Sequence, residues 1–187
     1  MRVIAGKFRS RRLKGPGKLR LRPTSDRLRE TLFNVLGPSV ADSLFVDLYA
    51  GTGAIGIEAI SRGAREVIFI ESHAPGTRLV RENLEALGIR SGAEVIEADV
   101  VRGLERLAKR HLLADFIFLD PPYDEPEEHL RVLEFIDESH LLAPLGLVIV
   151  EHHRHTELPD RFDRIELTRL LEQGDGTLSF YRLAAAA

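Results

Sequence analysis

The stretch that decides the fold is LFVDLYAGTGAIG, residues 44–56. Its first half, Leu44–Tyr49, is a short apolar run that is typical of a buried β-strand. Its second half places glycines at positions 51, 53 and 56 in a GxGxxG arrangement, ahead of an apolar segment that reaches about Arg62. Glycines at such a junction allow a tight turn, let the backbone approach a ligand and permit close packing of a helix against a strand. The stretch therefore predicts a strand, a ligand-binding turn and a helix, in that order.

Downstream of this unit, strand-like and helical segments alternate. We expect strands at Glu66–Ile70, Ala93–Glu97, Asp115–Leu119 and Leu145–Val150, and helices at Pro75–Leu87, Val100–Leu112 and Glu127–Ser139. Continuously apolar strands separated by helices indicate an α/β fold, with a parallel sheet covered on both faces. Asp163–Leu171 and Thr177–Leu183 alternate polar and apolar residues around the turn at 174–176, which predicts a closing hairpin with an antiparallel last strand.

The N-terminal region differs in charge from the rest of the chain. Residues 1–30 contain eleven Lys and Arg against two acidic residues, a net charge of +9, whereas the whole 187-residue chain carries -3. We expect a small β-hairpin from Arg2–Ala5 and Arg11–Lys14, followed by a helix that starts after Arg22-Pro23 and ends at Gly37-Pro38. A basic arm on an acidic body suggests contact with a polyanion, and a solvated basic tail is the alternative that composition leaves open.

Composition narrows the class of protein further. The 44% of hydrophobic residues suffice for a core, and the chain shows neither a signal-peptide pattern nor an apolar run of the roughly 18–20 residues that a membrane span needs. With no cysteine, disulfides, thiolate metal sites and a cysteine nucleophile are excluded. We expect a cytoplasmic enzyme.

Acidic residues stand where a nucleoside cofactor needs them. Glu71 ends the second expected strand, where a carboxylate can accept hydrogen bonds from both ribose hydroxyls, and Asp99 follows the third, within reach of an adenine. The same features describe a dinucleotide site, and an ordinary glycine turn is the simplest alternative. Asp47 favours S-adenosylmethionine over NAD, because its carboxylate can reach the ammonium group that NAD lacks. The candidate cofactor-binding residues are Asp47, Tyr49, Ala50, Gly51, Thr52, Gly53, Gly56, Glu71, Ser72, Asp99, Val100 and Asp120.

The fourth expected strand ends in the candidate catalytic motif Asp120-Pro121-Pro122-Tyr123. The exocyclic amine of a base is a poor nucleophile, because its lone pair is delocalised into the ring. Asp120 and the carbonyl of Pro121 can accept its two N–H bonds and orient the nitrogen for attack on a methyl group. Pro122 stiffens the turn, and Tyr123 can stack on the base. The motif does not distinguish guanine N2 from adenine N6 or cytosine N4.

These residues resemble those of a known family. The glycine turn, Glu71 and the Asp120–Tyr123 motif look like a class I methyltransferase, and RVIAG at 2–6, RRL at 11–13 and RPTSDRLRETLF at 22–33 resemble the RsmD-type enzymes. The resemblance spans nearly the whole chain. It implies a seven-stranded Rossmann-like sheet, S-adenosylmethionine as cofactor with S-adenosylhomocysteine as product, and methylation of guanine N2 in small-subunit (16S) ribosomal RNA. It also implies RNA within an assembled or partly assembled subunit as the substrate, and we expect a monomer.

The chain then divides into a basic extension, residues 1–38, and a cofactor-binding domain, residues 39–187. The candidate RNA-binding residues are Arg9, Arg11, Arg12, Arg22, Thr24 and Arg27. Thr24, Arg27 and Glu30 can instead close over the cofactor, and Glu30 can simply pair with Arg27 or Arg29 on the helix surface.

Histidines at positions 152, 153 and 155 suggest a metal site at first sight. On a strand only His153 and His155 share a face, and a third ligand is lacking, so a solvated loop after the fifth strand is favoured. His73, beside Glu71, either borders the cofactor or is simply exposed. An NAD-dependent oxidoreductase and a non-catalytic RNA-binding module remain as rival functions.

Overall fold

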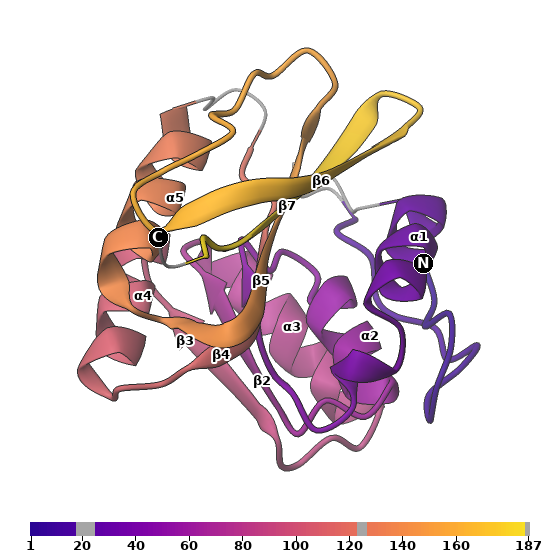
Figure 1. The fold of residues 1–187 in the computed structure, drawn as a ribbon. Helices are drawn as coiled ribbons and strands as arrows, with labels where there is room; N and C mark the ends of the chain where they lie inside the picture. The colour runs from indigo at the N-terminus through magenta and orange to yellow at the C-terminus, as the bar shows by residue number, and fades with distance from the viewer. Residues whose placement is uncertain (18–24, 123–126, 186–187) are drawn as a thin grey trace.

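A single mixed sheet forms the centre of the molecule (Figure 1). The computed structural model describes residues 1–17, 25–122 and 127–185. The sheet strands in this part of the chain are β1 (Leu44–Leu48), β2 (Glu66–Glu71), β3 (Ala93–Glu97), β4 (Ala114–Leu119), β5 (Leu142–His153), β6 (Ile165–Gln173) and β7 (Gly176–Leu183). Their order across the sheet is β3-β2-β1-β4-β5-β7-β6. Strands β1 to β5 pair in parallel, and β7 runs antiparallel to both of its neighbours, which confirms the expected topology.

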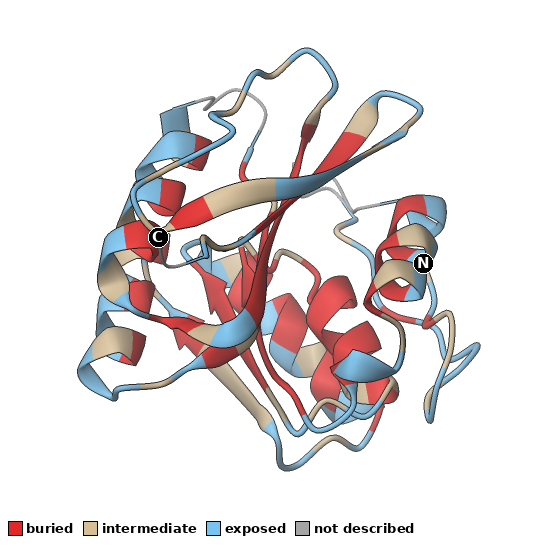
Figure 2. Ribbon diagram, in the orientation of Figure 1, coloured by how far each residue is buried: buried red, intermediate tan, exposed pale blue. Residues whose placement is uncertain are grey.

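Helices cover both faces of this sheet. They are α1 (Asp26–Leu36) with the short 3-10 helix η1 (Gly37–Val40), α2 (Ala54–Ser61), α3 (Ala74–Ala86), α4 (Val100–Lys109) and α5 (Glu127–Ser139). Helices α1, α2 and α3 pack on one face, where Phe33 of α1 stacks on Phe45 of β1 with ring centroids 6.1 Å apart. Helices α4 and α5 pack on the other, through Leu104 and Leu133 among others. The central strands are therefore buried on both sides (Figure 2), as their continuous apolar sequences require.

The N-terminal arm, residues 1–14, is docked on α2. Where two short strands were expected, a single antiparallel bridge joins Arg2 to Arg12. Instead of completing a ladder, the backbone N–H groups of Ile4 and Ala5 donate to the carboxylate of Glu58, at 2.7 and 3.0 Å. Val3 and Leu13 of the arm are buried in the core on this face, at 1% and 6% exposure. Residues 1–14 are therefore docked on the core rather than forming a solvated tail.

Within the described residues, no helix combines the length and the apolar character that a membrane span requires.

Candidate cofactor and catalytic site

The glycine turn and the Asp-Pro-Pro motif leave the sheet side by side. Strands β1 and β4 are parallel neighbours, and Leu48 of β1 is the register partner of Leu119 of β4. Tyr49 and Asp120 therefore follow at the same carboxyl edge. The strand order also reverses direction between β1 and β4, which is where ligands of open α/β sheets bind.

Asp47 lies within β1, directly below the glycine turn. Its side chain is 2% exposed, and its Oδ2 accepts a hydrogen bond of 2.8 Å from the backbone N–H of Gly56 in the first turn of α2. Burial raises the pKa of Asp47 to about 8, and the neighbouring charge of Glu71 acts in the same direction. A cationic group beside Asp47 would favour its ionised form. The site therefore fits a ligand that carries an ammonium group.

The glycines of the turn have different surroundings. Gly51 has a φ of +55°, and a Cβ built there meets only the carbonyl oxygen of Tyr49, at 3.7 Å. The side of Gly51 on which a Cβ would stand is thus open to a ligand. A Cβ at Gly56 would lie 2.3 Å from the ring of Phe69, so this glycine lets α2 pack directly on β2. Gly53, with a φ of +75°, is the N-cap of α2.

Asn83 of α3 fixes the turn to the N-terminal arm. Its side chain is 1% exposed, and its Nδ2 donates to the carbonyl oxygen of Thr52 at 2.9 Å and to that of Lys14 at 3.1 Å. Its Oδ1 accepts from the Lys14 N–H at 2.7 Å. No sequence pattern indicates this role, because a single asparagine in a helix belongs to no motif.

Glu71 is anchored at the carboxyl end of β2. Its Oε2 accepts from the Gly51 N–H and its Oε1 from the His73 N–H, both at 2.8 Å. Each carboxylate oxygen has a second lone pair, so the anchored group can still accept from two hydroxyls. Ser72 and His73 are exposed beside it, whereas Ala50 is buried and donates its N–H to Ile70 O.

Asp99 belongs to a chain of polar contacts that starts at Tyr49. The Tyr49 hydroxyl donates to Glu128 of α5 at 2.5 Å, Arg131 donates to Glu128 at 2.8 Å, and the same Arg131 nitrogen donates to Asp99 at 3.0 Å. Partial burial alone would raise the pKa of Asp99, but hydrogen bonds from Arg131 and from backbone N–H groups outweigh it and lower that pKa. Glu128 and Arg131 were not identified from the sequence. Val100, next to Asp99, has its side chain buried in the core.

The candidate catalytic motif is described only in part. Asp120 is half-buried, Pro121 is buried and Pro122 is exposed. Tyr123 lies outside the described residues, as do Arg22 and Thr24 of the candidate RNA-binding set.

The cluster at 151–155 corrects one expectation. Residues 151–153 belong to β5 rather than to a solvated loop, and Glu151 and His152 are buried, at 6% and 3% exposure. His152 contacts the Ser179 hydroxyl at 2.8 Å and the carbonyl oxygen of His153 at 3.0 Å, and burial lowers its pKa. These contacts let polar residues continue a buried strand. No group of three potential metal ligands occurs among the described residues.

The remaining RNA-binding candidates lie on the surface. Arg9, Arg11 and Arg12 are exposed on the arm, and Arg27 is exposed on α1. Arg29, by contrast, is fully buried and pairs with Asp26 at 2.9 Å, which contradicts the expected surface pair of Arg29 with Glu30.

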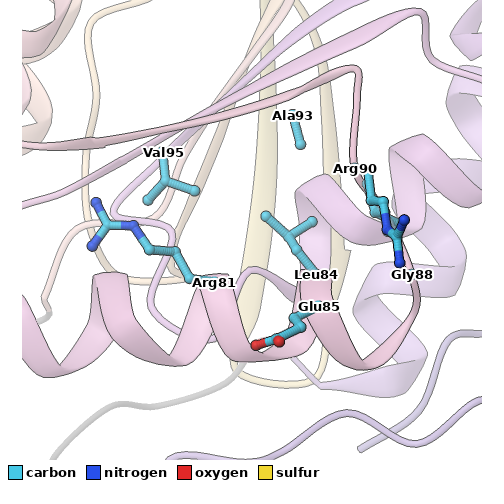
Figure 3. A pocket seen from close by; sticks show the side chains of 8 residues that line it. Arg81, Leu84, Glu85, Gly88, Arg90, Ala93 and Val95 are labelled. Carbon is cyan, nitrogen blue, oxygen red and sulfur yellow. The ribbon is translucent and has the colours of Figure 1, made fainter.

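A separate hollow of about 440 Å³ lies between α3 and the edge strand β3 (Figure 3). Its lining residues are Arg81, Leu84, Glu85, Gly88, Ile89, Arg90, Ala93 and Val95. None of them is a candidate site residue, so this hollow is distinct from the carboxyl edge described above.

Comparison with known proteins gives consistent matches over nearly the whole chain. The family described as "Conserved hypothetical protein 95" matches residues 1–182. Ribosomal RNA small subunit methyltransferase D of Escherichia coli is 35% identical over 161 residues, which cover 85% of this chain and 78% of the relative. The protein of the same name from Haemophilus influenzae is 35% identical over 190 residues, covering 98% and 92%.

Solved structures agree with the fold. An Escherichia coli protein provisionally assigned as a methyltransferase has a TM-score of 0.86 and 31% identity, covering 100% of this chain and 99% of that one. A provisionally assigned methyltransferase solved with S-adenosylhomocysteine has a TM-score of 0.68 at 15% identity, covering 84% of this chain and 48% of the other, and at that identity it supports the fold alone.

Proposed function

The chain belongs to the family of the ribosomal RNA small subunit methyltransferase D enzymes, and we propose that it methylates the exocyclic N2 amine of a guanine in 16S ribosomal RNA. The observation that carries the proposal is the shared carboxyl edge of β1 and β4. It joins a turn suited to a nucleoside cofactor with a motif suited to an amine. The relatives are named as methyltransferases, which disfavours the oxidoreductase alternative.

The cofactor is S-adenosylmethionine, which supplies an electrophilic methyl group on a positively charged sulfur. The buried Asp47 suits its ammonium group, the open side of Gly51 suits close approach of the ligand, and the anchored Glu71 suits the ribose hydroxyls. Asp99 suits the adenine side, with Arg131 holding its carboxylate in place. The other candidate cofactor residues lie at the glycine turn or next to Glu71, Asp99 and Pro121.

The chain's own contribution to the reaction is alignment. Asp120 and the carbonyl oxygen of Pro121 accept the two N–H bonds of the amine and direct its lone pair at the methyl group, Pro122 stiffens the turn, and Tyr123 stacks on the base. The leaving proton passes to Asp120 or to water. A base that starts in a helix must first be flipped out, which costs a few kcal/mol and favours a nucleotide that is already unstacked.

The exposed arginines of the arm suit phosphates that flank the target. In this proposal residues 1–38 form the RNA-facing extension, and Arg22, Thr24 and Arg27 are among its RNA-binding residues. The protein works as a monomer in the cytoplasm, on RNA that is part of an assembled or partly assembled small subunit.

The test is methyl transfer from labelled S-adenosylmethionine to 16S ribosomal RNA or to small subunits, with mass spectrometry of the modified nucleoside. We expect N2-methylguanosine, and we expect Asp120→Ala to abolish incorporation. N6-methyladenosine or N4-methylcytidine would overturn the choice of base. Binding of RNA without any incorporation would favour the non-catalytic RNA-binding module.

A further inference from the structure

A second carboxylate lies next to the candidate catalytic motif. The register of β4 and β5 pairs Phe118 with Ile149 and Leu119 with Val150. Asp120 and Glu151 are the next residues on the two strands. Because neighbouring strands lie about 4.8 Å apart, these two backbone positions are adjacent at the carboxyl edge.

Glu151 is directed to the same face of the sheet as the cofactor turn. Side chains alternate along β5, so that Val148 and Val150 pack in the core under α4 and α5, whereas Ile149 packs in the core under α1 and α2. Glu151 shares the face of Ile149. Asp47 of β1 also points to this face, since it accepts from Gly56 of α2.

Its burial makes Glu151 an unusual choice for a position that only has to fill space. The side chain is 6% exposed, and its residue pairs with Leu178 of β7 just beyond the last β4–β5 pair, Leu119 with Val150. An ionised carboxylate has about four lone-pair sites, so it can accept a further hydrogen bond beside the contacts it already makes. A carboxylate at the edge of the proposed base site is well placed to accept a hydrogen bond from an N–H group of the base.

The bases differ in what they offer beside the exocyclic amine. Guanine presents the N1–H donor next to its N2 amine, whereas adenine presents the N1 acceptor next to N6 and cytosine the N3 acceptor next to N4. A carboxylate attracts the guanine donor and repels both acceptors. The choice among the three amines, which the Asp-Pro-Pro motif leaves open, then depends on the strand beside it.

We propose that Glu151 is a specificity-determining residue that accepts the N1–H of the target guanine while Asp120 and Pro121 hold its N2 amine. This inference rests on the proposed function and deepens it. It assigns the selection of guanine to one side chain of β5.

The test uses 2-aminopurine, which keeps the N2 amine but has an acceptor at N1. Small-subunit RNA is prepared with either guanosine or 2-aminopurine at the nucleotide that mass spectrometry identifies as methylated. We expect the wild-type protein to methylate guanosine about 10- to 100-fold faster, which corresponds to the loss of one hydrogen bond to a charged group. Glu151→Gln should slow guanosine and raise the relative rate on 2-aminopurine, because the glutamine amide can donate to N1.

Matched variants keep the outcome interpretable. Glu172→Gln makes the same chemical change at an exposed position of β6 and should keep the wild-type ratio. Glu151→Asp retains the carboxylate and should keep the preference for guanosine at a lower rate. Melting temperature and cofactor binding establish that each variant is folded.

Two results separate failure of this inference from failure of the proposed function. If Glu151→Gln lowers the rates on guanosine and 2-aminopurine by the same factor, Glu151 only supports the site and the inference is overturned. If the wild-type protein methylates no guanine in small-subunit RNA, the proposed function fails and the inference fails with it.

Discussion

Replacing Asn83 by alanine removes a buried junction between the arm, α3 and the glycine turn. Three hydrogen bonds of 2.7 to 3.1 Å are lost, and the Thr52 carbonyl and both backbone groups of Lys14 lose their partner. At about 1 kcal/mol net for each hydrogen bond, the free energy of unfolding should fall by about 2–4 kcal/mol. For a chain of this length that corresponds to a melting temperature about 4–16 °C lower.

The sequence supplies a matched control for this variant. Asn34, the other asparagine, is exposed on α1, so Asn34→Ala makes the same change where the structure shows no such junction. Asn34→Ala should change the free energy of unfolding by no more than about 0.5 kcal/mol. Both variants gain the higher helix propensity of alanine, so their difference isolates the hydrogen bonds.

Thermal unfolding followed by circular dichroism gives the stability of both variants, and calorimetric titration gives their affinity for S-adenosylmethionine. We expect only Asn83→Ala to weaken cofactor binding, because Asn83 holds the Thr52 carbonyl in the turn. Equal melting temperatures for the two variants would refute the reasoning.

Three further variants probe other parts of the site. Because the folded-state pKa of Asp47 is raised to about 8, the folded protein retains a proton that the unfolded chain loses near pH 4. Stability of the free protein should therefore fall as pH rises between these values, by up to about 1.4 kcal/mol per unit. Asp47→Asn should remove that dependence of the free energy of unfolding, measured by urea unfolding across this pH range. Parallel profiles of stability against pH for the variant and the wild type would contradict this expectation. Gly56→Ala should lower the free energy of unfolding by about 2 kcal/mol, because the added methyl group overpacks against β2. Gly15→Ala, with no neighbouring atom within 4 Å, should be neutral. A Gly56→Ala protein that melts like the wild type would show that α2 can shift away from β2. Replacing Arg9 and Arg12 by alanine should make the salt dependence of RNA affinity shallower by about 1.4 in log–log slope, with cofactor affinity unchanged, and an unaltered slope would remove these residues from the RNA surface.

Local patterns predicted those parts of the molecule whose structure depends on near neighbours in the sequence. The apolar run before Gly51 and the carboxylate twenty residues after it are positioned by one strand–turn–helix unit, so the turn and its anchor Glu71 could be anticipated. The closing hairpin was predicted for the same reason, from the alternation on either side of its turn.

The features that sequence reasoning missed depend on contacts between distant residues. The arm was expected to form two short strands, but the N–H groups of Ile4 and Ala5 donate to Glu58, which lies more than fifty residues away. Polar residues at 151–153 resemble a loop, yet all three pair with β7, and the hydroxyl of Ser179 contacts His152. Neither partner can be identified without the fold.

The position of β7 in the sheet also bears on the order in which parts of the protein become available during translation. As the polypeptide emerges during translation, β1 to β4 are made first, and they carry the glycine turn, Glu71 and Asp120 at their carboxyl ends. Glu151 acquires its pairing strand only after residues 176–183 have been made, because β7 lies between β5 and β6. Under the proposed function, the strands assigned to the methyl donor are therefore synthesised before the strand that pairs with Glu151.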